Sequence, residues 1–219
     1  FQVRPQNVGY MDARIESNFP HLPPMVGFAA TAQFRSDVPP AGGDGYGGMI
    51  DQLELFATLP GPAVVVFQDV DDPPVGATFG EVMCSTYQAY GSAGLITSGG
   101  GRDLEQVKAL DYPVFTGATI CSHGFNHMLH IGMPVRVGGL MVNTGDLLHG
   151  DANGITNIPP EIAGEVADAA GEFLELENIM LDYVKADGGK TIDGFKERRQ
   201  QFQAEVAKLK TRLTQRSTN

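Results

Sequence analysis

The chain has 219 residues, of which 42% are hydrophobic and 19% charged, a composition that allows a sizeable buried core. Its formal net charge of −11 argues against a nucleic-acid partner, because phosphate binding needs clustered cations and the 15 basic residues are scattered, apart from a mixed-charge stretch at 196–216. No run of 18 apolar residues occurs, so no membrane-spanning segment is predicted.

Alternating strand and helix patterns fill the first half of the chain. The period-2 alternation at 25–34 predicts a strand, and the Pro/Gly-rich stretch at 38–48 predicts a flexible surface loop. The patterns that follow predict, in order, a helix at 49–59, a buried strand at 63–70, a helix at 79–91 that ends at Gly91, a strand at 94–101 and a short helix at 104–110.

From residue 112 onward, short strand patterns separated by turn signals replace this alternation. A long helix is predicted after Pro159 and Pro160 and is stopped by Gly188 and Gly189. A last helix carries a narrow apolar stripe, which predicts a seam against another helix, within the subunit or between subunits, formed by Phe195, Phe202, Val206, Leu209 and Leu213. The whole pattern predicts an α/β sandwich with C-terminal helices.

The two cysteines, Cys84 and Cys121, predict two buried free thiols in a reducing compartment. No signal peptide is visible, although the chain opens abruptly at Phe1. We therefore expect a cytoplasmic protein, and the length favours a single domain.

The stretch "SGGGRDLEQVKAL" at 98–110 places opposite charges directly behind three glycines. It is not a dinucleotide-binding fingerprint, because Leu104 stands where the third glycine belongs. Arg102, at the end of a buried strand, would need an anion beside it. Asp103 has two interpretations: a functional carboxylate, or the N-cap of the following helix in a capping box with Gln106.

Glu81 has the same two interpretations, because "TFGE" at 78–81 has the form of a capping box that starts at Thr78. A helix that begins near Thr78 would also point free amides at an anion. The six lysines all lie on predicted helices or turns, where no Schiff-base amine is expected. A metal ion is therefore the more plausible electrophile if the protein performs carbonyl chemistry.

Three histidines, His123, His127 and His130, follow one another at a spacing similar to that of zinc ligands. They do not form an H-E-x-x-H motif and lie between strand patterns, which favours a surface or pocket-lining loop without zinc. In "HGDANG", which contains His149, Asp151 is expected to organise a turn.

Glu81, followed after twenty residues by Arg102 and Asp103, resembles the acid-x20-Arg-Asp signature of the RraA-like family. The resemblance extends from about Met25 to Ile162 and includes the downstream pattern "VGG…V…GD…GD-x-x-G". It implies a swivelling β/β/α sandwich over 1–219, with 160–219 as a helical extension. It also implies homotrimers or homohexamers with active sites between subunits.

The family includes class II aldolases, so the resemblance implies a lyase that acts on a small 2-keto acid. The expected reactions are retro-aldol cleavage of a 4-hydroxy-2-oxo diacid to pyruvate and decarboxylation of oxaloacetate. By similarity, Asp103 would ligate Mg²⁺ or another divalent cation such as Mn²⁺, Arg102 would hold the pyruvyl end, and Glu81 would position a water. The backbone amides of Val82 and Met83 would receive the substrate carboxylate.

The family also includes non-catalytic regulators that bind a ribonuclease, which is the alternative function. Those regulators lack the aspartate after the arginine, so the intact Arg102–Asp103 pair favours the enzyme. The chain departs from the family at Gln106, where many members carry an acid, and in its loops at 42–48 and 123–130. A glutamate from a neighbour's C-terminal helix is common in family sites, and Glu175 and Glu177 are both candidates.

Overall fold

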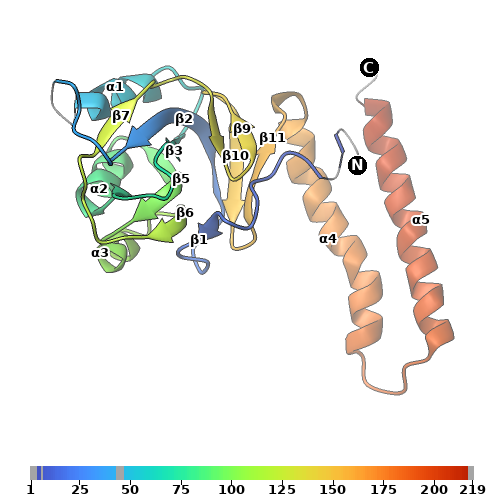
Figure 1. Ribbon diagram of the computed structural model, residues 1–219. Coiled ribbons are helices and arrows are strands. Elements are labelled where there is room, and N and C mark those ends of the chain that lie inside the picture. Colours follow the sequence, from blue (N-terminus) through green and yellow to red (C-terminus); the bar gives the residue numbers. More distant parts are fainter. Residues whose placement is uncertain (1–3, 6, 43–46, 217–219) are drawn as a thin grey trace. The chain divides into compact units, whose positions relative to one another are not determined.

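A nine-stranded sheet organises the residues from Arg4 to Pro159 in the computed structural model, which describes residues 4–5, 7–42 and 47–216 (Figure 1). The strands run in the order β1-β6-β5-β3-β2-β10-β11, with β4 paired to β5 and β7 paired to β2. Their bounds are Glu16–Ser17 (β1), Met25–Arg35 (β2), Ala63–Asp69 (β3), Ala77–Phe79 (β4), Ser92–Gly101 (β5), Val114–Thr119 (β6), His127–Leu129 (β7), Leu147–Asp151 (β10) and Gly154–Ile158 (β11). A separate antiparallel pair consists of β8 (Val135–Val137) and β9 (Leu140–Val142).

The centre of the sheet is parallel, because β2, β3, β5 and β6 all run in the same direction. Parallel neighbours need crossover connections, and three helices occur in them: α1 (Gly47–Phe56), α2 (Glu81–Ala89) and α3 (Leu104–Ala109). Figure 1 shows these helices on the same side of β2, β3 and β5. The carboxyl ends of the parallel strands therefore meet at one edge, where α/β proteins commonly place their sites.

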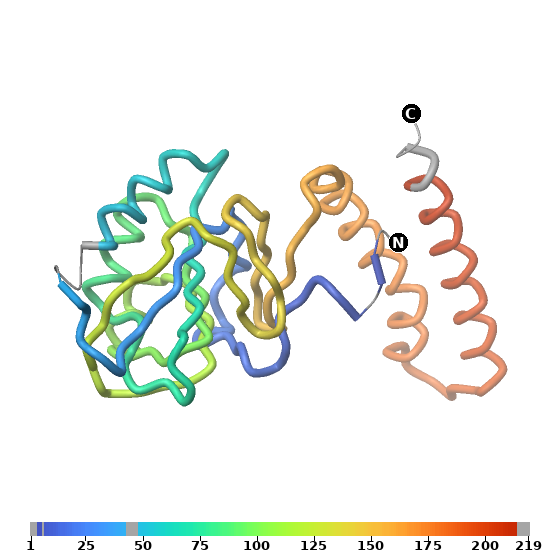
Figure 2. The backbone as a smooth tube through the Cα atoms, turned by 45° about the horizontal axis from the view of Figure 1, so that its top comes forward, coloured from blue at the N-terminus to red at the C-terminus, as the bar shows by residue number. Residues whose placement is uncertain are grey.

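The N-terminal segment connects the two edges of the sheet. The guanidinium of Arg4 donates to the carbonyl of Asn157 at 2.8 Å, and the Met11 amide donates to the carbonyl of Ile155 at 2.9 Å. The chain then pairs as β1 with β6 at the opposite edge. Figure 2 shows this blue segment beside β10 and β11. The sheet is thus nearly closed, which confirms the predicted mixed α/β sandwich.

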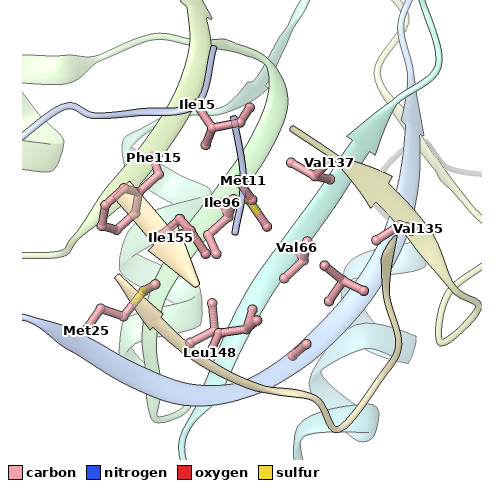
Figure 3. Packing of buried hydrophobic residues seen from close by; sticks show 13 residues of the cluster. Met11, Ile15, Met25, Val66, Ile96, Phe115, Val135, Val137, Leu148 and Ile155 are labelled. Carbon is pink, nitrogen blue, oxygen red and sulfur yellow. The ribbon is translucent and has the colours of Figure 1, made fainter. Parts of the chain in front are cut away.

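Each face of the sheet covers its own apolar cluster. One cluster lies between the sheet and the β8–β9 pair and includes Ile15, Val66, Ile96, Phe115 and Val137 (Figure 3). The other lies beneath α1, α2 and α3, and its largest members are Phe34, Phe67, Phe79, Tyr87 and Tyr112. The two faces differ in what covers them, so alternate residues of one strand reach different environments.

The predicted strands at 25–34 and 63–70 are confirmed as β2 and β3. The helix predicted at 79–91 is shorter, because Phe79 belongs to β4 and α2 begins at Glu81. Gly91, with φ +85°, follows this helix in the left-handed conformation, as predicted for its end. Part of the loop predicted at 38–48, residues 43–46, lies outside the described residues.

The second unit, from Pro160 onward, is a pair of helices: α4 (Ala163–Lys185), preceded by a 3₁₀ turn at Pro160–Ile162, and α5 (Ile192–Arg216). The rings of Phe173 and Phe202 pack edge to face across the pair, with centroids 5.9 Å apart, and Leu209 is buried. The apolar stripe predicted on the last helix therefore forms its seam against α4 within one chain. None of the helices described combines the length and the apolar character needed to cross a membrane.

The prediction for the cysteines is half right. Both thiols are free, but only Cys84 is buried, whereas Cys121 is exposed in the loop after β6. The difference arises from secondary structure, since Cys84 lies on the inner face of α2 and Cys121 lies just beyond the end of a strand.

Candidate functional site

Three glycines at the carboxyl end of β5 allow neighbouring elements to approach this strand closely. A Cβ on Gly101 would lie 2.1 Å from the ring of Phe79, and one on Gly100 would lie 2.4 Å from the side chain of Ile120. At Gly99 the obstacle would be the carboxylate of Asp69, also at 2.4 Å. The glycines therefore serve close packing, and the strand end that they shape carries Arg102 and Asp103 directly behind it.

Asp103 connects the end of β5 to the start of α2. Its backbone adopts the left-handed conformation, with φ +56°, which aspartate tolerates better than most residues. Its Oδ2 atom accepts a hydrogen bond of 3.1 Å from the amide of Glu81 and lies 3.7 Å from the guanidinium Nε of Arg102. The carboxylate can occupy this position because Gly80 has no side chain, since a Cβ on Gly80 would lie 2.5 Å from Oδ2.

Both capping-box predictions are wrong. Asp103 occupies the N-cap position of α3 but makes no side-chain hydrogen bond to that helix, because its carboxylate is turned toward α2 instead. The N-cap of α2 is Gly80, and Thr78 lies in β4, where its hydroxyl donates to the Gly100 carbonyl at 3.0 Å. Neither Asp103 nor Glu81 is therefore explained by capping of its own helix.

The first turn of α2 leaves two amides available beside this pair. The helical hydrogen-bond ladder begins with the Cys84 amide, which donates to the Gly80 carbonyl at 3.0 Å. The Glu81 amide is taken by Asp103, whereas the amides of Val82 and Met83 precede the ladder and have no helical acceptor. The positive end of the helix dipole lies at the same place, so an anionic group is favoured there.

The predicted site residues differ in exposure. The side chains of Arg102 and Asp103 are 34% and 39% exposed, which leaves both accessible to a ligand. Val82 and Glu81 are exposed, and Met83 is buried. The structure thus brings Arg102, Asp103 and the α2 amides together at the carboxyl edge of the sheet, with the apolar side chains of α2 beneath them. Burial, reinforced by the nearby charge of Asp103, raises the pKa of the Cys84 thiol in this floor.

The sequence interpretation missed Asp69, the last residue of β3. Its Oδ1 accepts a 3.0 Å hydrogen bond from the Asp71 amide, and its own amide donates to the Ser98 hydroxyl at 2.9 Å. Its Oδ2 is buried and has no partner among the described residues. Burial raises the pKa of the Asp69 carboxyl to about 6. An aspartate directly after a continuous apolar run is the signal that could have identified it.

The histidines of the 123–130 segment lie elsewhere, and His127 begins β7 rather than belonging to a loop. His130 has φ +48° and lines a groove of 670 Å³ together with Asp51 and Glu54 of α1. No group of three or more potential metal-ligating side chains exists in the described part of the chain. The turn predicted at Asp151 is confirmed, because its carboxylate accepts the Asn153 amide at 2.7 Å.

Comparisons with known proteins show the family to which the chain is similar. The family model of RraA-like proteins, described as Aldolase/RraA, matches residues 4–156. The chain is 32% identical over 106 residues to a Halalkalibacterium halodurans protein named "Putative 4-hydroxy-4-methyl-2-oxoglutarate aldolase", a match that covers 48% of this chain and 50% of that protein. The chain spans about half the length, or less, of the curated relatives it matches.

Solved structures show the same fold. A protein of unassigned function from Pseudomonas syringae superposes with a TM-score of 0.68 at 22% identity, covering 89% of this chain and 83% of that one. RraAS2 of Streptomyces coelicolor, described as an unusual member of the RNase ES inhibitor RraA family, gives a TM-score of 0.62 at 21% identity, covering 78% and 82%.

Proposed function

Because the chain belongs to the RraA-like family of Aldolase/RraA proteins, we propose that it is a divalent-metal-dependent lyase that acts on a small 2-keto acid. The proposed reactions are retro-aldol cleavage of a 4-hydroxy-2-oxo diacid to pyruvate and decarboxylation of oxaloacetate, since both leave the same pyruvate enolate. The observation that supports this most is the hydrogen bond between Asp103 and the Glu81 amide, which brings the Arg102–Asp103 pair against the open first turn of α2.

The surroundings of Asp103 fit a hydrated Mg²⁺ or Mn²⁺ ion. Its Oδ2 is engaged by the Glu81 amide, while nothing in the described residues donates a hydrogen bond to Oδ1. Mg²⁺ typically takes one or two protein carboxylates and keeps several waters, so Asp103 with a water-linked Glu81 is sufficient. When bound, the cation would supply Lewis-acid polarisation of the 2-keto oxygen.

The roles of the protein groups follow from their chemistry. Arg102 offers a planar fork of donors that matches the carboxylate of the pyruvyl end, and the amides of Val82 and Met83 add two further donors to that anion. Glu81 holds a water that receives the proton of the 4-hydroxyl group. As the C3–C4 bond breaks, C4 becomes the carbonyl carbon of the second product and the electron pair of the broken bond passes to C3 of the pyruvyl fragment. The proton taken from the 4-hydroxyl group is then returned to C3, which completes pyruvate.

The proposal is tested by a pyruvate-release assay on a panel of 4-hydroxy-2-oxo diacids and oxaloacetate, with Mg²⁺, with Mn²⁺ and with EDTA. We expect turnover that EDTA abolishes. If no panel member releases pyruvate with either cation, the lyase is refuted and the alternative, a non-catalytic regulator that binds a ribonuclease or another enzyme, remains. The Streptomyces coelicolor relative gives that alternative its support.

Variants at the site separate the metal ligand from the substrate clamp. Asp103→Asn keeps an acceptor for the Glu81 amide, so stability should change by less than about 1 kcal/mol, while activity should fall by about 10³-fold or more. Arg102→Lys keeps the charge but loses the fork, so KM should rise while Mg²⁺ binding persists. Glu105→Gln, two residues along and exposed on α3, is the matched control. Near-wild-type turnover by Asp103→Asn would remove the metal-ligand assignment.

We also propose that the protein is cytoplasmic and assembles as a homotrimer or homohexamer, with a neighbour's α4 supplying a glutamate to the site. Glu175 and Glu177 are both on α4, and Glu175 is the more exposed. Light scattering at micromolar concentration should give the mass of three or six chains. A monomer that turns over normally would exclude the shared site.

A further inference from the structure

A second polar cleft, of 830 Å³, lies within the larger unit, and we refer to it as the β1–β6 cleft. None of Glu81, Arg102 and Asp103 lines it. Its walls come from several parts of the chain: the segment around β1, the end of β3 with the loop that follows it, β5, the end of β6, and β8 with the turn after it. The volume falls within the range of small-molecule sites.

The cleft lies on the sheet face opposite the helices. Gly117 comes two residues after Phe115 in β6, so alternation places it on the face of the cluster shown in Figure 3. Gln68 follows Val66 in the same way. The apolar core of this face therefore gives way to polar groups at the carboxyl ends of the strands, whereas the buried side chains of α2 belong to the cluster on the other face.

One uncompensated cation lines the cleft. Arg14 also lines it, but its guanidinium is paired with Asp12 by hydrogen bonds of 2.9 and 2.7 Å. Arg136 is held through its backbone, whose amide donates to Gln68 Oε1 at 2.9 Å, and its side chain is exposed. No carboxylate of the described residues lies within 4 Å of the Arg136 guanidinium, which leaves its planar fork available for an anion.

Neutral hydrogen-bonding groups surround this cation. The side chains of Ser17 and Thr119 contribute two hydroxyl groups to the lining. The other neutral polar side chains of the cleft are those of Asn18, Gln68, Ser98 and Thr116, of which the Ser98 hydroxyl already accepts the Asp69 amide and the Thr116 hydroxyl already donates to the Gly99 carbonyl. None of the described lining residues is aromatic, so nothing in the cleft favours a nucleobase or another flat ring.

We propose that the β1–β6 cleft binds a small polyhydroxylated carboxylic acid, with its carboxylate on Arg136 and its hydroxyls on the hydroxyl groups of Ser17 and Thr119. A single uncompensated guanidinium balances one negative charge, and the carboxylate of Glu16 at the same cleft disfavours a dianion such as phosphate. The several hydroxyl and amide groups match the hydroxyls of the ligand. This site is separate from the proposed catalytic one and does not depend on the proposed reaction.

The test is isothermal titration calorimetry of the 219-residue chain with three matched probes. They are gluconate, glucose, which has the hydroxyls without the carboxylate, and hexanoate, which has the carboxylate without the hydroxyls. Gluconate should bind at least tenfold more tightly than either of the others. Absence of gluconate binding, or equal binding of glucose or hexanoate, would overturn the proposal.

Variants then place the binding in the cleft. Arg136→Gln and Thr119→Ala should each weaken gluconate binding, the former by about tenfold or more. Arg198→Gln, which removes an exposed arginine of α5 that does not line the cleft, is the matched control and should bind as wild type. Arg136→Lys keeps the charge without the fork and provides a second measurement if Arg136→Gln does not fold. Unchanged affinity in both Arg136 variants, or loss of binding in Arg102→Gln alone, would assign the ligand to another site.

Discussion

Replacing Gly101 by alanine should destabilise the larger unit severely, although it adds a single methyl group. The added Cβ would lie 2.1, 2.4 and 2.9 Å from three atoms of the Phe79 ring, and ordinary contact begins at 3.4 Å. Phe79 is 2% exposed and belongs to β4, which pairs with β5 at Gly101 itself, so neither strand can retreat without breaking the pairing.

Overpacking of this kind costs about 3 kcal/mol. For a unit of this size that corresponds to a fall in Tm of about 6 to 12 °C. Circular dichroism melts of wild type and Gly101→Ala measure it directly. Gly42→Ala is the matched control in the same unit, because no atom lies within 4 Å of its added methyl, and its effect should stay within about 0.5 kcal/mol.

A double-mutant cycle with Phe79→Leu tests the cause. The three ring atoms closest to the added Cβ are Cζ, Cε1 and Cε2, and leucine has none of them. The double variant should therefore be little less stable than Phe79→Leu alone, which gives a coupling energy of about 2 kcal/mol. A Gly101→Ala protein that melts within 2 °C of wild type, or a cycle without coupling, would refute the view that the glycines serve close packing.

Three further predictions concern Asp69, the two cysteines and the histidines of the 123–130 segment. The folded-state pKa of Asp69, about 6, lies above its ordinary value of 3.8, so folding favours the protonated carboxyl, and this contribution is lost as pH rises from about 4 through 6. This difference in pKa corresponds to a loss of at most about 3 kcal/mol in the free energy of unfolding. Solvent screening of this half-buried group reduces the loss to about 1 to 2 kcal/mol. Urea titrations between pH 4 and 7 should show that Asp69→Asn is about 1 to 2 kcal/mol more stable than wild type at pH 7 and that its stability changes less with pH. Equal pH dependence of the two proteins would contradict a raised pKa for Asp69. Ellman's reagent should modify one thiol in the native protein, Cys121, and reach Cys84 only after unfolding, since Cys84 is buried and its pKa raised; two fast-reacting thiols would show that α2 opens. Metal analysis of untagged protein should find no stoichiometric zinc at His123, His127 and His130, and zinc that is lost together with the fold when all three become alanine would reverse this prediction.

The sequence by itself predicted the elements whose cause is local. The continuous apolar run at 63–70 can only be a strand covered on both faces, and it is β3. Gly91 ends α2 because glycine adopts positive φ without steric cost. The sequence also predicted an anion beside Arg102 on the expectation that burial excludes solvent from it; the Arg102 side chain is instead 34% exposed, and the carboxylate of Asp103 lies 3.7 Å from its Nε atom.

The direction of the Asp103 carboxylate was decided only by the tertiary structure. Local pattern favoured a cap on the following helix, because Gln106 stands three residues later, but the carboxylate meets the amide of Glu81 instead, 22 residues away along the chain. That contact exists because β4 and β5 are neighbours and Gly80 has no side chain to block it. Spacing along a single segment carries no information about such an approach.

The same reason applies to Asp69 and to the β1–β6 cleft. The Asp69 carboxylate lies against Gly99 of the adjacent strand, which has no Cβ to block it, and the cleft combines Ser17, Ser98 and Arg136 from segments far apart in the sequence. Strand order and register bring these groups together, and both are determined by which apolar faces bury each other in the folded chain. Periodicity within each segment predicts that a face will be buried, but the partner of that face is determined only when the whole sheet forms.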